Sequence, residues 1–191
     1  KIVGLPAEDF PSPQNLDGQT AMTLNAQQLR WAIDRTAFVV CPDDNRYGIN
    51  GAHLEVQEGN DGSPRLRLVA TDGHRLSYGQ VPFSGTFGMA ERMLIPRKAL
   101  AEMKKLTERL DGDVELSFGE NGALLTTPGA RFYFRLIDGE FPDYRKVVPT
   151  PHHRKVSGSR EVLVSALKRV GVLAQDRGRP VRFEFGAEHL T

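Results

Sequence analysis

The chain has 191 residues, of which 39% are hydrophobic and 26% charged, and a formal net charge of +1. This length fits one large domain, or one complete domain with parts of its neighbours, and the composition is typical of a folded globular protein. No apolar run approaches the roughly 18 residues of a membrane helix. The small net charge argues against a strongly basic nucleic-acid binder, although a protein that slides on DNA should contact its backbone only weakly.

Residues 1–20 are rich in Pro, Gly, Asp and Asn and are predicted to be the end of one unit followed by a linker. They lack the basic start, apolar middle and cleavage site of a signal peptide. The first residue is Lys1 rather than Met, as we expect of a chain cut out of a longer one.

From Leu24 the spacing of apolar residues becomes helical, and Cys41-Pro42 ends the predicted helix. Its buried stripe consists of Leu29, Ile33, Thr36, Ala37 and Val40. Cys41 is the single cysteine, so neither an internal disulfide nor a thiolate metal site is expected, which favours a reducing cytoplasm. We interpret it as a buried, inert thiol rather than a nucleophile.

Strands and a second helix follow. RLRLVA alternates, with Leu66 and Leu68 on one face. A helix opened by Pro96 and ended by Asp111-Gly112 should bury Leu100, Met103, Leu106 and Leu110. VELSF and ALLTT flank Asn121-Gly122, a hairpin signal because both turn positions favour positive φ, and RFYFRLI is a further strand. We therefore predict an α+β fold with two amphipathic helices packed on antiparallel sheets.

A weak internal repeat indicates tandem copies of one module. Phe10-Pro11 returns as Phe141-Pro142, and each pair is followed by a linker and an amphipathic helix. The two helices share the pattern Leu29, Ala32, Ile33, Arg35 and Leu163, Ala166, Leu167, Arg169. Chance similarity between two amphipathic helices is the alternative interpretation.

ATDGHRL, residues 70–76, follows an alternating strand, and Asp72-Gly73 should form a tight turn that presents Thr71, His74 and Arg75. Asp72 and His74 could serve as an acid/base or metal pair. Catalytic zinc, however, needs three protein ligands, and the other histidines, His53, His152, His153 and His189, lack a metal-type spacing. The sequence also has no Gly-rich phosphate loop and no G-x-S-x-G nucleophile motif. We predict neither an enzyme nor a metal or cofactor.

LIDGEFPDYRKVVP, residues 136–149, is predicted to be extended because of Phe141-Pro142 and Pro149. Tyr144, Val147 and Val148 give this connector apolar surface. It is either a simple linker on the domain edge or one wall of a ligand groove at a domain junction.

ATDGHRL and DGEFPDYRKVVP, in this order and at this spacing, resemble the two hallmark segments of the bacterial sliding clamp, the beta subunit of DNA polymerase III. RYGING (46–51) and LIPRKAL (94–100) are similar to that family as well. The resemblance implies a DNA-clamp fold of tandem modules: residues 1–20 as the tail of clamp domain 1 and a linker, 21–149 as complete domain 2, and 150–191 as the first part of domain 3.

Members of the family form a head-to-tail dimeric ring around duplex DNA, with helices on the inner wall. The resemblance implies a non-enzymatic, cytoplasmic processivity factor that contacts DNA phosphates without regard to sequence. The DNA-facing residues would be Arg30, Lys98, Lys105 and Arg109. A solvated face with Lys98–Glu102 and Lys104–Glu108 pairs is the alternative for the second helix.

The family also binds short peptides of polymerases, clamp loaders and repair proteins in a pocket between domains 2 and 3. Carried over, that pocket would use Ile49, Thr71, Gly73, His74, Arg75, Leu76, Pro142, Lys146 and Val147. Apolar walls would take leucine and aromatic anchors, and polar rims would orient the peptide. Lys146 departs from the Arg often found there, and an ammonium cannot stack as a planar guanidinium does.

Val172 and Leu173 match hydrophobic positions of the family's dimer interface, which the intact protein would use. Two other functions stay open from the residues alone. One is a free-standing protein-interaction domain that does not bind DNA, and the other is a metal-dependent hydrolase that uses Asp72 and His74.

Overall fold

The computed structural model describes residues 4, 6–9, 16, 21–43, 45–46, 48–59, 61–85, 93–149, 156–173, 181–186 and 189–191. These residues divide into two compact units, Lys1–Tyr144 and Arg145–Thr191, which are treated separately below. Phe10-Pro11 and the His152-His153 pair lie outside the described residues. Among the helices of the described part, none is long and apolar enough to cross a membrane.

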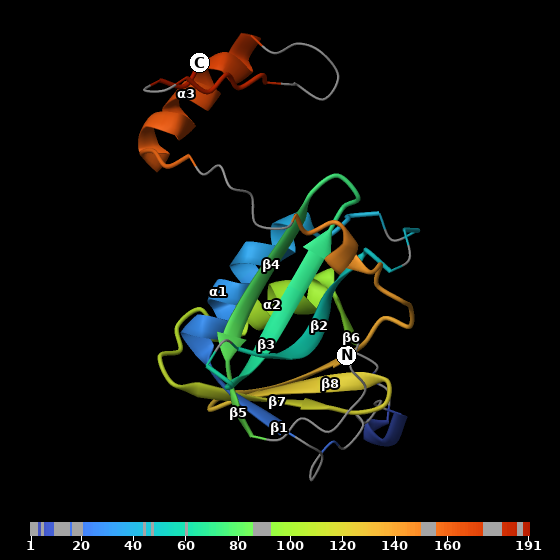
Figure 1. The fold of residues 1–191 in the computed structure, drawn as a ribbon. Coiled ribbons are helices and arrows are strands. Elements are labelled where there is room, and N and C mark those ends of the chain that lie inside the picture. The colour runs from blue at the N-terminus through green and yellow to red at the C-terminus, as the bar shows by residue number, and fades with distance from the viewer. Residues whose placement is uncertain are drawn as a thin grey trace. The chain divides into compact units, whose positions relative to one another are not determined.

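The first unit consists of two similar halves (Figure 1). After a short 3-10 helix η1 (Ala7–Asp9), the first half runs β1 (Ala21–Asn25), α1 (Ala26–Thr36), a 3-10 turn η2 (Ala37–Val39), β2 (Gly51–Glu58), β3 (Pro64–Thr71) and β4 (Leu76–Pro82). After β5 (Ser84–Gly85), the second half runs β6 (Met93–Pro96), α2 (Arg97–Thr107), β7 (Asp113–Phe118), β8 (Gly122–Thr127) and β9 (Ala130–Arg135).

The halves exchange their first strands. The five-stranded sheet has the order β5-β1-β7-β8-β9 and the four-stranded sheet the order β4-β3-β2-β6. β1 therefore pairs with β7 of the other half, and β6 pairs with β2, all antiparallel. The α+β class and the two helices on antiparallel sheets are as predicted from the sequence.

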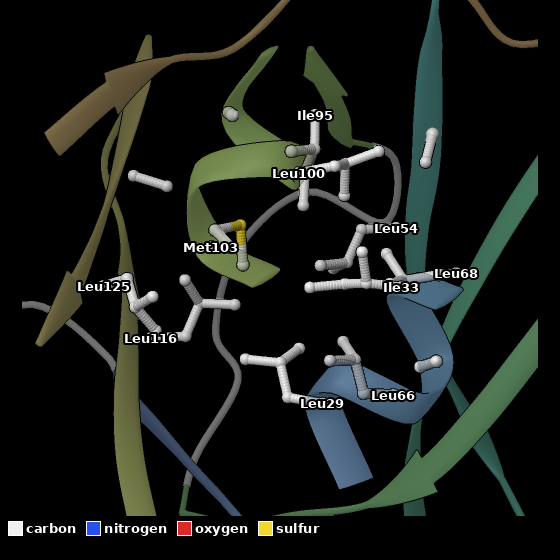
Figure 2. Close-up of a cluster of buried hydrophobic side chains, with 14 of the residues drawn as sticks. Leu29, Ile33, Leu54, Leu66, Leu68, Ile95, Leu100, Met103, Leu116 and Leu125 are labelled. Atoms are coloured by element: carbon white, nitrogen blue, oxygen red, sulfur yellow. The ribbon is translucent and has the colours of Figure 1, made fainter. Parts of the chain in front are cut away.

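The main core lies among both helices and both sheets. Figure 2 shows side chains from all four elements pointing into one space, with Leu29 and Ile33 from α1 and Leu100 and Met103 from α2. Leu66 and Leu68 are buried on the inner face of β3, as the alternation predicted. Periodicity alone thus located these residues of the core, because a helix stripe and a strand face both bury apolar side chains here.

The boundaries of α1 differ from the prediction. Leu24, expected in the helix, lies in strand β1, because Asn25 caps the helix: its Oδ1 accepts hydrogen bonds from the backbone N–H groups of Gln27 (3.1 Å) and Gln28 (3.3 Å). At the other end α1 stops at Thr36 and a 3-10 turn continues to Val39. Cys41 is buried, as expected.

The end of α2 also differs. The helix ends at Thr107, before the predicted Leu110, and Arg30 of α1 donates hydrogen bonds to the carbonyl oxygens of Thr107 (3.3 Å) and Glu108. The carbonyls at a helix end lack intrahelical donors; that of Thr107 also accepts from the Leu110 N–H (3.3 Å), and the Arg30 guanidinium supplies a further donor to this end. Leu110 is only partly buried in the following turn.

The β7–β8 hairpin is confirmed, but the reason given for its glycine was wrong. Gly122 does not adopt positive φ; in the described part the glycines that do are Gly48, Gly62, Gly73 and Gly85. A Cβ on Gly122 would stand 2.4 Å from the hydroxyl of Tyr133. The close approach of β9 therefore explains this glycine.

The second unit contains η3 (Tyr144–Lys146, which begins with the last residue of the first unit) and α3 (Arg160–Leu173). Within this unit the apolar side of α3, with residues such as Leu163 and Leu167, lines a hollow of about 790 Å³ together with Phe183 and Phe185. The predicted helix around Leu163 is thus present. Whether it begins a repeat of the α1 module stays a prediction.

Candidate functional site

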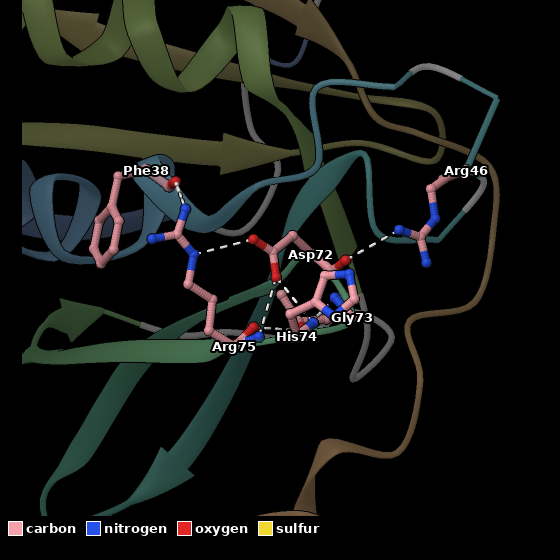
Figure 3. Close-up of polar contacts among 7 residues, drawn as sticks. Phe38, Arg46, Asp72, Gly73, His74 and Arg75 are labelled. Carbon is pink, nitrogen blue, oxygen red and sulfur yellow. Dashed lines mark hydrogen bonds and ion pairs between the residues drawn. The ribbon is translucent and has the colours of Figure 1, made fainter. Parts of the chain in front are cut away.

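The turn between β3 and β4 is held by its own side chains (Figure 3). The Oδ1 of Asp72 accepts hydrogen bonds from the backbone N–H groups of His74 and Arg75, each 3.0 Å long. The Thr71 hydroxyl donates to the Arg75 carbonyl (2.7 Å) and accepts from the Gly73 N–H (3.1 Å). Gly73 has a φ of +89°, which an L side chain rarely adopts. The ATDGHRL segment therefore forms the tight turn that its sequence predicted, with His74 exposed at its tip.

Asp72 is the acceptor that organises this turn. Its two hydrogen bonds from the backbone N–H groups of His74 and Arg75, together with the Arg75 guanidinium 3.0 Å from its Oδ2, lower the pKa of the Asp72 carboxyl to about 2. Both carboxylate oxygens thus accept hydrogen bonds within the turn. This arrangement suits a structural acceptor better than a general base or a metal ligand.

Two residues join the turn that the sequence did not single out. Arg46 donates a hydrogen bond of 3.1 Å to the carbonyl oxygen of Asp72, and its guanidinium lies beside Gly73. The Arg75 guanidinium packs over the ring of Phe38, 5.4 Å from its centroid, and donates to the Phe38 carbonyl (3.4 Å). Phe38 is 60% exposed, which gives this side of the turn an aromatic surface. Phe38 does not fall on the apolar stripe of the predicted helix, and this was the signal that could have found it.

A second, smaller hydrophobic cluster lies beneath the turn. It contains Ile49, Val69, Phe141 and Tyr144, with Leu76 packed against it. Two residues of the predicted peptide pocket, Ile49 and Leu76, thus share one cluster with the connector residues that flank Pro142. Pro142 itself is exposed.

Lys146 and Val147 belong to the second unit and are exposed there. Their part in the predicted pocket stays a prediction. The same holds for the predicted dimer-interface role of Val172 and Leu173, which are 78% and 80% exposed at the end of α3.

The predicted DNA-facing residues divide into two groups. Lys98, Lys105 and Arg109 are exposed on or just beyond α2. Arg30 is half-buried and caps the end of α2, so its hydrogen-bonding capacity is largely directed into the protein. Lys105 lies 2.8 Å from Glu102, whereas Lys104 pairs with Asp34 of α1 at 2.5 Å. Neither ion pair is one that helical spacing had suggested.

No group of three or more His, Cys, Asp or Glu side chains that could hold a metal ion occurs among the described residues. His53 is buried and stacks on Phe141, with 5.2 Å between ring centroids. It therefore packs inside the protein, whereas His74 is exposed.

The family model for the central domain of the DNA polymerase III beta subunit matches residues 23–143. The beta sliding clamp of Pseudomonas aeruginosa is 35% identical over 180 residues, which is 94% of this chain and 48% of that relative. The chain thus spans about half the length of the curated relatives it matches.

Solved structures show the same similarity. A sliding clamp of Pseudomonas aeruginosa bound to griselimycin superposes with a TM-score of 0.84 at 35% identity, covering 95% of this chain and 48% of that one. A sliding clamp of Bartonella birtlesii, also bound to griselimycin, gives a TM-score of 0.77 at 37% identity, with coverages of 90% and 46%. The solved structures thus support the resemblance predicted from the sequence. Because residues 23–143 match the central-domain model, the chain belongs to the family of the DNA polymerase III beta subunit.

Proposed function

We propose that this chain is part of a DNA sliding clamp, a processivity factor that encircles duplex DNA as a homodimeric ring and docks polymerases, clamp loaders and repair proteins. The observation that carries the proposal is the match of residues 23–143 to the central domain of the family. In this proposal residues 1–20 end domain 1, residues 21–149 form domain 2 and residues 150–191 begin domain 3. The role consists of binding alone, so it requires no catalytic residue, and a cytoplasmic location suits it.

The DNA-facing surface in this proposal is the exposed side of α2 with Lys98, Lys105 and Arg109. Support comes from the first turn of the helix, where Arg97 and Lys98 stand and no acidic residue is present. Cations at a helix N-terminus oppose the helix dipole and cost about 0.3–1 kcal/mol each. Proteins often depart from such a helix preference where a residue has a functional role. In this proposal the role of the cations is to attract DNA phosphates.

The peptide-binding surface in this proposal consists, within the first unit, of Ile49, Thr71, Gly73, His74, Arg75, Leu76 and Pro142. Support comes from the shared cluster that holds Ile49, Leu76 and Phe141 together beneath the exposed turn. Such a surface combines apolar anchoring sites with a polar rim that is already ordered, so a peptide loses little to rearrangement of the protein. Lys146 and Val147 are proposed to add to this surface from the second unit.

Titration of a fluorescent peptide with leucine and aromatic anchors tests the peptide surface, with griselimycin, which two similar clamps bind, as competitor. Saturable binding is expected, and His74→Ala and Pro142→Ala should each raise the Kd at least about fivefold. Glu120→Ala, in the exposed β7–β8 turn, is the matched control and should leave the Kd unchanged. Equal binding by all four proteins would reject this surface.

Anisotropy of labelled duplex DNA tests the basic surface. Binding should be weak, independent of sequence and steeply salt-dependent, with a log–log slope that falls by about 0.9 for each phosphate contact removed. The triple charge reversal Lys98→Glu, Lys105→Glu, Arg109→Glu should therefore reduce the slope. An unchanged slope would show that these residues do not contact phosphates.

A further inference from the structure

Glu55 is a buried acid on the outer face of the four-stranded sheet. Its side chain is only 5% exposed. The residues of the same strand that face inward are all apolar, so Glu55 is a buried charge on the face turned away from the main core. In the strand register Glu55 stands directly opposite Arg67 of β3, which in turn stands opposite Gln80 of β4. A row of three polar side chains thus crosses three strands, and its Glu55 end is covered rather than solvated.

Four side chains are among the contacts of the Glu55 carboxylate. Gln57 donates a hydrogen bond of 2.7 Å to Oε1, and the Arg67 guanidinium lies 3.7 Å from the same oxygen. His53 Nε2 lies 3.4 Å from Oε2. The fourth partner is the Tyr144 hydroxyl, which donates to Oε1 and accepts a hydrogen bond of 3.0 Å from Arg67. Tyr144 is the one of these four that comes from the connector rather than from the sheet.

The connector is attached to the sheet at a second point as well. The ring of Phe141 stacks on His53, with centroids 5.2 Å apart and planes 11° from parallel, and Phe141 meets the ring of Tyr144 edge-on at 6.4 Å. Both residues are buried, whereas Pro142 between them is exposed. Pro142 is therefore presented by a short segment whose two flanking side chains are fixed on β2 and β3.

Chemistry makes the Tyr144 contact selective for one placement of the connector. A buried carboxylate is costly unless its oxygens accept hydrogen bonds, and a connector shifted by one residue would bring Asp143 or Arg145 to this position instead of a phenol. Burial, and next the Glu55 acceptor, raise the pKa of Tyr144 above its usual value of 10.0, so the hydroxyl remains a donor at neutral pH.

The same strand links this contact to the turn. Arg67, Val69 and Thr71 alternate along the outer face of β3: Arg67 binds Tyr144, Val69 lies in the small cluster and Thr71 closes the turn that presents His74. A strand is a rigid support for such an arrangement. The placement of Pro142 relative to the turn therefore depends on the Glu55–Arg67–Tyr144 contacts.

We infer that Tyr144 is a positioning residue of the peptide-binding surface, which holds Pro142 at the distance from the Thr71–Leu76 turn that a bound peptide requires. The inference rests on the proposed peptide surface and adds a residue that acts only through others. Tyr144 itself is buried and leaves the contact with peptide to Pro142 and the turn.

Tyr144→Phe removes the hydroxyl and keeps the ring. The Kd of the labelled peptide with leucine and aromatic anchors should rise about tenfold, as expected for losing a hydrogen bond to a charged group. Tyr133→Phe, on β9 of the other sheet, is the matched control and should bind as the wild type does. Glu55→Gln, whose amide oxygen can still accept from the phenol, should lose less than Tyr144→Phe.

A double-mutant cycle with Pro142→Ala separates positioning from a general loss of stability. If Tyr144 acts through Pro142, Tyr144→Phe should cause no further loss of affinity in the Pro142→Ala protein. Losses that multiply in the double variant, or wild-type affinity in Tyr144→Phe, would overturn the inference while leaving the peptide surface intact. A wild-type chain that binds no peptide would overturn the proposed surface and the inference together.

Discussion

The two faces of β3 contrast in what they bury. Leu66, Leu68 and Ala70 point inward, where they belong to the apolar cluster of the main core. Arg67 and Val69 point to the outer face, where the connector covers them together with Glu55 and His53. The apolar packing of the inner face is common to many α+β proteins, whereas the outer face holds a specific set of polar contacts.

The two faces also differ in how far apart in the sequence their contacting residues lie. The inner face is defined by a period of two along the strand, and any well-packed apolar set would satisfy it. The outer face depends on the hydrogen bonds between Arg67 and Tyr144, 77 residues apart, and between Glu55 and Tyr144, 89 residues apart. Variants of neighbouring residues on the two faces should therefore differ in size of effect and in what they disturb.

The largest effect should come from the inner face. Leu68→Ala removes a side chain that is 1% exposed at the centre of the main core (Figure 2), and the cavity should lower the free energy of unfolding by about 2–5 kcal/mol. Urea denaturation measures this loss. Leu106→Ala, on the partly buried side of α2, should cost clearly less, and equal losses would mean that Leu68 is not central to the core.

Arg67→Met, one residue away, should cost less and act differently. It leaves the Glu55 carboxylate without its guanidinium and Tyr144 without one donor, so we expect a loss of about 1–3 kcal/mol. Adding Glu55→Gln should restore part of that loss, because the uncompensated charge is then removed. Arg65→Met, on the same face of β3 but paired with the exposed Asp61 of the β2–β3 turn, should stay within about 1 kcal/mol of the wild type. A loss as large as that of Arg67→Met would reject the special role of the network.

Sequence patterns predicted the inner face well because it depends on short-range periodicity. Leu66, Leu68, Leu100 and Met103 were all placed correctly, as was the turn at Asp72-Gly73. The failures lie at element ends. Leu24 was expected in the helix but lies in strand β1, which is only five residues long. Asn25 was the available signal for the helix start, because Asn is a favoured N-cap residue.

The outer face was predicted only in part. Tyr144 was read as apolar surface of a connector, and no pattern indicated that its hydroxyl meets Glu55. Arg46 and Phe38 were missed at the turn for the same reason, since they lie 26 and 37 residues from their partners in the sequence. Long-range polar contacts leave no local period, so the proposed peptide surface rests on the resemblance to clamps rather than on periodicity.

The turn at the end of β3 should show its own dependence on pH. The pKa of Asp72 is about 2 in the folded chain and about 3.9 when unfolded, so its contribution to stability is complete above pH 4. That contribution is lost as the pH falls from about 4 through 2. The stability difference between the wild type and Asp72→Asn, measured by urea denaturation, should shrink over that window.

Asp61 provides a matched case for this pH dependence. Hydrogen bonds from the side chain and backbone of Ser63 lower its pKa to about 2 as well, so Asp61→Asn should give the same pH window. It lies in the β2–β3 turn, at the opposite end of β3 from Asp72. Asp72→Asn should weaken peptide binding and Asp61→Asn should not; equal peptide affinities would show that the order of the Thr71–Leu76 turn is irrelevant to binding.

The smallest effects on stability should come from the exposed side of α2, which belongs to neither face of β3. Lys98→Glu places an acid in the first helical turn and should raise the free energy of unfolding by about 0.3–1 kcal/mol, because the helix dipole favours it there. Lys105→Glu, in the last turn, should lower it by a similar amount and also loses the Glu102 pair. Both variants should nevertheless weaken binding of duplex DNA in the anisotropy measurement. If the two variants change the free energy of unfolding in opposite directions but both weaken DNA binding, these lysines act on phosphates. If DNA affinity instead rises and falls with stability, they act only on the helix.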